Sequence, residues 1–106
     1  NSAIYYLKDF SSDDILLSAL AKGAIGDSYA QLNQSEEALA YYIQAVDASE
    51  NVYTTPRYLF KAGLLSSSLG KNNKALAYFK RIKSDFPNSD EASQIDIQIG
   101  RLENIN

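Results

Sequence analysis

The sequence predicts an all-α fold built from antiparallel helical hairpins. No segment of the 106 residues alternates polar and apolar side chains for long, whereas helical spacing of apolar residues recurs along the chain. In addition, two blocks of sequence repeat at one common offset of 37 residues. Because the segments between the helical patterns are short, we expect neighbouring helices to pack antiparallel.

Start and stop signals place the first three long helices. Ser12, Asp13 and Asp14 supply a predicted N-cap and an acidic first turn for the first of them. Ser35 is the predicted N-cap of the second helix. Pro56 lies in the predicted first turn of the third, where its missing N–H costs nothing.

Two further helices are predicted after these, and a short one before them. Gly70 is a predicted left-handed stop, after which Asn72 or Asn73 caps a fourth helix that ends at Pro87. Residues 89–91 are predicted to open the last helix. The apolar face of this last helix comprises Ala92, Ile95, Ile99 and Leu102. The short N-terminal helix is outlined by Ala3, Ile4, Leu7 and Phe10.

The internal repeat makes the fold more specific. Residues 24–26 (AIG) recur as 61–63 (KAG), and residues 38–42 (ALAYY) recur as 75–79 (ALAYF). These blocks resemble tetratricopeptide repeats, whose pattern runs W-x2-L-G-x2-Y, then A-x3-F, then P. Because the repeat of that family is about 34 residues long, the offset of 37 residues seen here implies about three extra residues between the two copies. We place them at Asn51 to Thr55.

The resemblance implies an α-solenoid and assigns packing roles within it. Small residues leave room where the two helices of a hairpin cross closely. They are Gly26, Gly63, Ala38 and Ala75. Aromatic residues fill the gaps between successive hairpins. They are Tyr29, Tyr42 and Phe79.

The predicted organisation is a single domain made of a half-repeat, two full repeats and a capping helix. The expected boundaries are 1–12 for the second helix of a truncated repeat, 13–50 and 55–87 for the repeats, and 88–104 for the cap. Because the chain begins inside a helical pattern and contains no Met, we interpret it as a piece of a longer protein. The truncated first helix is a candidate for self-association, since its apolar face lacks a partner helix.

Composition argues against catalysis. With no His and no Cys, the chain lacks the commonest general base, soft metal ligands and nucleophiles. Its net charge is −3 with acidic and basic residues interleaved, which disfavours nucleic-acid binding. We therefore expect no enzyme activity, no cofactor, no metal, no nucleic acid and no small-molecule substrate.

The predicted function is a scaffold that holds a partner protein or peptide in a concave groove. By the resemblance, the first helix of each repeat lines that groove. The groove positions are Leu20, Gly23, Asp27, Gln31, Arg57, Phe60, Lys61, Leu64 and Ser68. Phe60 and Leu64 are expected to cover an apolar anchor of the partner together. The alternative for Phe60 is a core position between the repeats.

Further residues and contexts follow from the same comparison. Tyrosines outside the repeat blocks are candidates for an interface. They are Tyr5, Tyr6, Tyr53 and Tyr58. Residues 20–50, 54–58 and 86–92 look like those of bacterial membrane-anchored tetratricopeptide proteins similar to the ancillary subunit of the Sec translocon. That resemblance implies a soluble piece of a parent anchored by a missing N-terminal span, with the repeats in the periplasm; otherwise we expect a cytoplasmic protein. The alternative function is a structural spacer or oligomerisation module.

Overall fold

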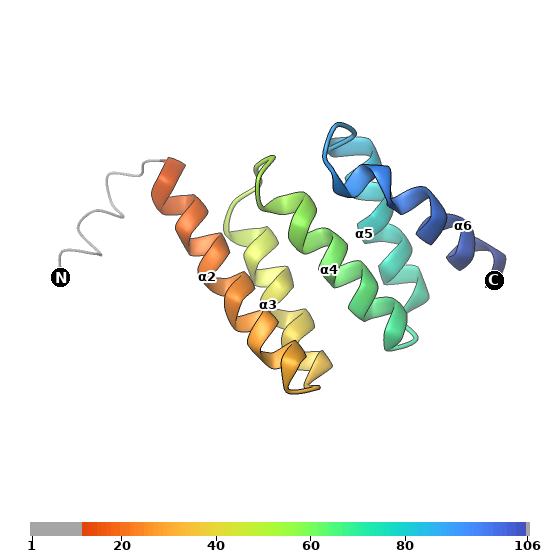
Figure 1. The fold of residues 1–106 in the computed structure, drawn as a ribbon, viewed down its shortest axis with the longest axis horizontal. Helices are drawn as coiled ribbons and strands as arrows, with labels where there is room; N and C mark the ends of the chain where they lie inside the picture. Colours follow the sequence, from red (N-terminus) through yellow and green to blue (C-terminus); the bar gives the residue numbers. More distant parts are fainter. Residues whose placement is uncertain (1–11, 106) are drawn as a thin grey trace.

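The computed structural model describes residues 12–105, which form five α-helices and one 3-10 turn. In chain order these are α2 (Ser12–Gln31), α3 (Ser35–Ala48), α4 (Thr55–Ser68), α5 (Asn72–Asp85), η1 (Glu91–Ser93) and α6 (Ile95–Ile105). No strand occurs within the described range. The chain turns back after each helix from α2 to α5, so these neighbours run antiparallel (Figure 1). The predicted all-α fold is confirmed.

The two hairpins close through the same turn. Within residues 12–105, a left-handed backbone occurs at Asn33 and Gly70, which have φ angles of 60° and 78°. The residue after each donates its N–H backward, to the carbonyl of Tyr29 at 2.9 Å and to that of Ser66 at 2.7 Å. These bonds satisfy carbonyls that the helix end leaves unpaired. The predicted stop at Gly70 is confirmed, and Asn33 is its counterpart in the first hairpin.

The predicted N-caps at Ser35 and at Asn72 or Asn73 are wrong. Gln34 and Lys71 occupy the N-cap positions, and neither makes a side-chain capping hydrogen bond. The physical reason is the tightness of the turn. The residue after the left-handed position already begins the next helix, because its carbonyl accepts the N–H four residues on at 3.0 Å in both hairpins.

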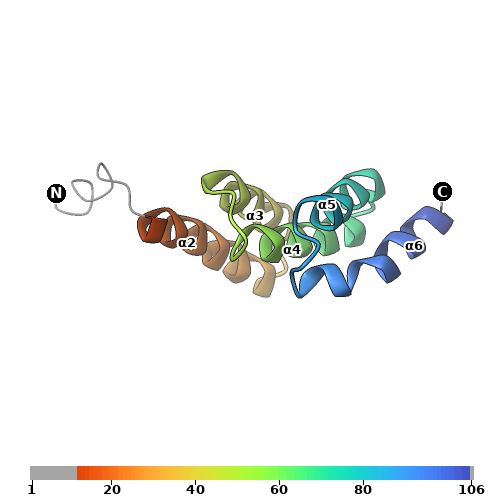
Figure 2. The ribbon, with the colours of Figure 1, turned by 90° about the horizontal axis from the view of Figure 1, so that it is seen from above.

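The helices lie in two layers. Figure 2 shows α3 and α5 on one side of the molecule and α2, α4 and α6 on the other. Each helix packs against the next one in the chain, so the hairpins stack in sequence order. Within residues 12–105 no helix combines the length and the apolar character needed to cross a bilayer.

Glycines permit the close crossing within each hairpin. A Cβ added at Gly26 would lie 2.7 Å from the Tyr42 ring, and one at Gly63 would lie 2.5 Å from Cε1 of Phe79. Real Cβ atoms are not found so close to a neighbour, so both positions require glycine, as the repeat pattern predicts. The largest fully buried apolar side chains are Leu59, Phe79, Ile82, Ile95 and Leu102.

The aromatic residues only partly follow their predicted roles. Tyr42 is buried and stacks on Tyr58 of the next hairpin, with ring centroids 5.9 Å apart. Tyr29 differs, because its ring stacks on Tyr41 of its own hairpin at 5.5 Å and remains partly exposed. The interface prediction for Tyr58 is wrong, since only 3% of this residue is exposed.

The last helix begins later than predicted. The backbone N–H groups of Ser93 and Gln94 donate to the carbonyls of Asp90 and Glu91 at 3.2 and 3.0 Å, and these bonds form the 3-10 turn η1. The α-helix α6 therefore starts at Ile95 rather than at residues 89–91. Three residues of the predicted apolar face are buried and Ala92 is partly buried against the core. The three buried residues are Ile95, Ile99 and Leu102.

Some predictions have no counterpart in the described structure. The short helix expected at Ala3, Ile4, Leu7 and Phe10 lies outside the described residues, as do Tyr5 and Tyr6. The boundaries 13–50, 55–87 and 88–104 stay predictions.

Candidate partner-binding face

Seven of the nine predicted groove residues are the candidates for partner binding, and they come from two helices of the same layer. Asp27 and Gln31 belong to α2, and Arg57, Phe60, Lys61, Leu64 and Ser68 belong to α4. On α4, positions 57, 61, 64 and 68 follow helical spacing and form one stripe. Along this stripe Arg57, Leu64 and Ser68 are exposed and Lys61 is half-buried; on α2, Gln31 is exposed and Asp27 half-buried. We call the surface made by these seven residues the α2–α4 face.

An ion pair joins the two helices in the middle of this face. Lys61 Nζ lies 2.7 Å from Asp27 Oδ1, and the Tyr42 hydroxyl donates to the same oxygen at 2.6 Å. Lys61 Nζ also lies 5.7 Å from the ring centroid of Tyr42 and 5.9 Å from that of Tyr58, within cation–π range. Lys61 is therefore paired with a carboxylate of its own chain and not with one that a partner would supply.

The protonation states of this cluster are stable near neutral pH. Partial burial acts to raise the pKa of Asp27. This effect is outweighed by hydrogen bonds from Lys61 and Tyr42 and by the positive charges of Lys61 and Arg57, so the pKa lies below its ordinary value of 3.8. Burial first, and then the hydrogen bond to Asp27, raises the pKa of the Tyr42 phenol. Tyr42 therefore remains a donor and Asp27 a charged acceptor.

The Tyr58 ring forms the buried base of the face. A Cβ at Gly23 would overlap with this ring, so the absence of a side chain there lets α2 approach α4. The Arg57 guanidinium lies 5.9 Å from the centroid of the same ring. Two residues placed in the groove by the resemblance are not open to a partner. Gly23 is buried beneath Tyr58, and Leu20 is partly buried against the core.

The two apolar residues of the face have different environments. Leu64 is 39% exposed and lies between the polar residues of the stripe. Phe60 is only partly exposed and packs against the core, with its ring centroid 5.9 Å from that of Phe79. Phe60 therefore contributes to packing within its hairpin, although part of its side chain is exposed to solvent.

The cluster of Asp27, Tyr42 and Lys61 was not predicted from the sequence. Tyr42 was assigned to packing alone, and its hydroxyl was given no role. The available signal was the pairing of an acid and a lysine in successive first helices, 34 residues apart. Within residues 12–105, no group of three or more His, Cys, Asp or Glu side chains converges as metal ligands do.

The comparison with protein families gives one match on each of the two hairpins. A family model described as tetratricopeptide repeat matches residues 19–52, and a second model with the same description matches residues 57–89. The chain belongs to the tetratricopeptide repeat family. The two matches leave residues 53–56 between them, a gap that overlaps the insertion expected at Asn51 to Thr55. No curated protein and no solved structure gave a significant match. Tetratricopeptide repeats generally mediate protein–protein interaction and are typically non-catalytic.

Proposed function

We propose that this chain is a non-catalytic scaffold that binds a partner protein or peptide on the α2–α4 face. The observation that carries the proposal is the α4 stripe, on which exposed Leu64 lies between Arg57 and Ser68. An apolar side chain bordered by polar ones offers both burial and hydrogen bonding to an extended or helical peptide.

The charges of the face favour an acidic group on the partner near Arg57. Lys61 is neutralised by Asp27 at 2.7 Å. Arg57 is exposed and makes no ion pair with another described residue, while its guanidinium lies over the Tyr58 ring. An arginine held against an aromatic ring loses less conformational freedom on binding than a fully mobile one.

A second candidate function is a structural spacer or oligomerisation module. The observation that favours it is an uncovered stripe on the other side of α2. Its members recur at helical spacing and are all exposed: Leu17, Ala21, Ala24, Ile25, Ser28 and Leu32. Leu17 and Leu32 are 62% and 65% exposed, which suits packing against a further helix. A cell-envelope or secretion context, with a membrane-anchored parent, rests only on the resemblance of residues 20–50, 54–58 and 86–92.

The experiment is site-specific photo-cross-linking of the intact parent protein in its cell. A photoreactive residue at position 64 is expected to capture a partner, whereas one at Ala77, exposed on α5 in the other layer, is not. Arg57→Ala is expected to reduce capture from position 64 by a free energy of about 1–3 kcal/mol, a range typical of moderate hot spots. The loss should be smaller at high salt.

The outcomes separate the two functions. Capture at position 64 that Arg57→Ala does not weaken would contradict the charge argument. If a photoreactive residue at Leu17 captures a second copy of the parent protein and one at position 64 captures nothing, the oligomerisation module would be favoured. For Phe60→Ala, lost binding with an unchanged melting temperature would assign its ring to the face. A large fall in melting temperature would assign it to the core.

A further inference from the structure

A cleft lies at one edge of the molecule, between two loops that contribute no residue to the α2–α4 face. One wall is the loop between α3 and α4, with Val52 and Tyr53. The other is the segment 85–89 that leaves α5, with Phe86 and Pro87. Its volume of about 320 Å³ lies at the lower end of the range of about 300–1,000 Å³ for ligand sites, so it suits one or two side chains. We call it the edge cleft.

The apolar side chains of the first wall are held in place without being buried. Val52 and Tyr53 are 66% and 69% exposed. The loop that carries them is nevertheless fixed by the carboxamide of Asn51, whose oxygen accepts the N–H groups of Tyr53 at 2.8 Å and Thr54 at 2.7 Å. Its nitrogen donates to the Ser49 hydroxyl at 3.1 Å. Exposed apolar groups on an ordered loop need little further ordering when they bind, which favours recognition.

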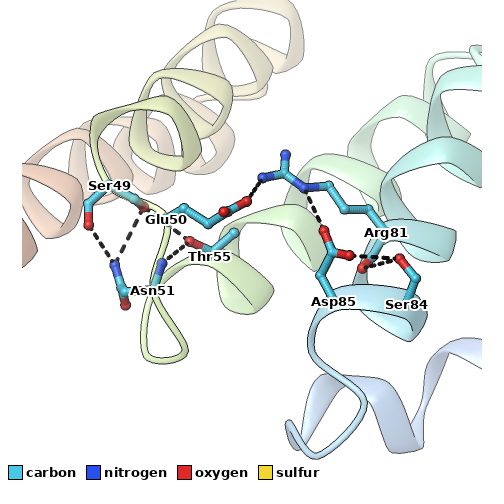
Figure 3. A network of polar contacts seen from close by, with 7 residues as sticks. All are labelled: Ser49, Glu50, Asn51, Thr55, Arg81, Ser84 and Asp85. Carbon is cyan, nitrogen blue, oxygen red and sulfur yellow. Dashed lines mark hydrogen bonds and ion pairs between the residues drawn. The ribbon is translucent and has the colours of Figure 1, made fainter.

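A bridge of charges fixes the spacing between the two walls. The Arg81 guanidinium on α5 pairs with Glu50 in the first loop, and its Nε lies 3.6 Å from Asp85 at the start of the second wall. Figure 3 shows Arg81 between these two carboxylates, with the Asn51 contacts on the other side of Glu50. The two walls are therefore tied together independently of any occupant.

The charge around the cleft indicates the chemistry of its occupant. Segments 47–54 and 81–91 carry five carboxylates and two basic side chains, an excess of three negative charges that equals the net charge of the whole chain. Both basic side chains are engaged internally, Arg81 as above and Lys83 with Asp96 at 3.0 Å. A cation is therefore favoured here. A second copy presenting the same acidic edge is repelled.

We propose that the edge cleft binds an extended peptide segment of a partner protein in which an apolar side chain is followed by Lys or Arg. The apolar side chain enters between Val52 and Phe86, and the cation lies against Asp85 and its acidic neighbours. The cleft and the α2–α4 face share no lining residue. This site therefore adds to the proposed function and does not depend on it.

The test is a titration followed by backbone amide chemical shifts in NMR, on the 106-residue chain. The probes are end-capped tetrapeptides of sequence Gly-Leu-Arg-Gly, Gly-Leu-Glu-Gly and Gly-Gly-Arg-Gly. The first is expected to shift the amides of residues 52, 53 and 86–89. The second and third, which lack the cation or the apolar side chain, are expected to bind at least tenfold more weakly.

Matched variants locate the site. Val52→Ser with Tyr53→Ser is expected to weaken the Gly-Leu-Arg-Gly probe at least fivefold. Leu17→Ser, which removes a similarly exposed apolar side chain from α2, is expected to change nothing. Equal binding of all three peptides, or shifts confined to other residues, would overturn the proposal. Shifts of the same amides with protein concentration alone would assign the cleft to a second copy and would overturn it as well.

Discussion

Asp27 on α2 and Lys61 on α4 form an ion pair of 2.7 Å that crosses the boundary between the two hairpins. The same Asp27 oxygen accepts the hydroxyl of Tyr42 on α3. One carboxylate thus connects three helices, and its position in the middle of the α2–α4 face makes it a determinant of how the hairpins stack as well as of the charge a partner meets.

The first prediction concerns the acid sensitivity of this contact. Because the folded-state pKa of Asp27 is lowered, its contribution to stability is present above the unfolded pKa of about 3.9 and is lost as pH falls through the folded value. Both side chains are partly exposed, so Asp27→Asn should cost only about 0.2–1 kcal/mol at pH 7. Urea unfolding should show that difference at pH 7 and convergence of the two proteins near pH 2.

Glu37→Gln is the matched control, because Glu37 is exposed and makes no ion pair with another described residue. It should leave the stability difference near zero at both pH values. A cost of Asp27→Asn that is the same at pH 7 and pH 2 would show that the carboxylate's charge is not the source of its effect.

The second prediction pairs two glycines in helices. Gly63→Ala should destabilise the chain by about 1–3 kcal/mol, because the new Cβ would meet the Phe79 ring in a packed interior. Gly100→Ala should stabilise it by about 0.5–1 kcal/mol, because the new Cβ would point into open space, with no atom beyond its chain neighbours and its own helix backbone within 4 Å, and alanine is the better helix former. Thermal unfolding followed by circular dichroism measures both. Equal effects of the two substitutions would contradict the packing argument.

The helices and the repeat could be predicted from sequence because their signals are local or periodic. The stop at Gly70 and the proline in the first turn of α4 reflect backbone geometry that a few neighbouring residues determine, whereas Gly26 and Gly63 were identified by the repeat. The Ser35 cap was wrong by one residue because Asn33 in the left-handed region was not recognised. The cap at Asn72 or Asn73 was wrong although Gly70 was recognised, because Lys71, directly after the left-handed residue, already begins the next helix.

The site was less predictable because it depends on how hairpins stack. The repeat pattern assigned Lys61 and Asp27 to the same surface, but their pairing is set by the rotation of α2 against α4. That rotation depends on Tyr58 packing into the space above Gly23. No local sequence pattern indicates that Tyr58 of α4 packs into the space left by the missing side chain of Gly23 on α2.

The third prediction concerns an unsatisfied hydroxyl. Ser66 is fully buried on α4, and its Oγ has no hydrogen-bond partner among the described residues. Because a buried polar group without a partner costs free energy, Ser66→Ala should stabilise the chain by about 1 kcal/mol. Ser67→Ala is the control, since its Oγ accepts from Arg101 at 3.2 Å and its loss should be neutral or slightly destabilising. An unchanged or lower melting temperature for Ser66→Ala would indicate that the hydroxyl is satisfied in solution.

The last prediction concerns Asn51, which orders the loop between the hairpins. Thr54 is 1% exposed, and its N–H donates to the Asn51 carboxamide oxygen while its Oγ1 accepts from the carboxamide nitrogen at 2.7 Å. Asn51→Ala removes both partners from a buried residue, so we expect a loss of about 1–3 kcal/mol in urea unfolding. Hydrogen exchange at the amides of Tyr53 and Thr54 should accelerate, since both lose their acceptor.

Asn51→Asp keeps the acceptor oxygen and removes only the donor, so amide protection should survive while part of the stability is lost. Protection of these two amides that persists in Asn51→Ala would show that the loop is ordered by its attachment to Arg81 through Glu50, and not by Asn51.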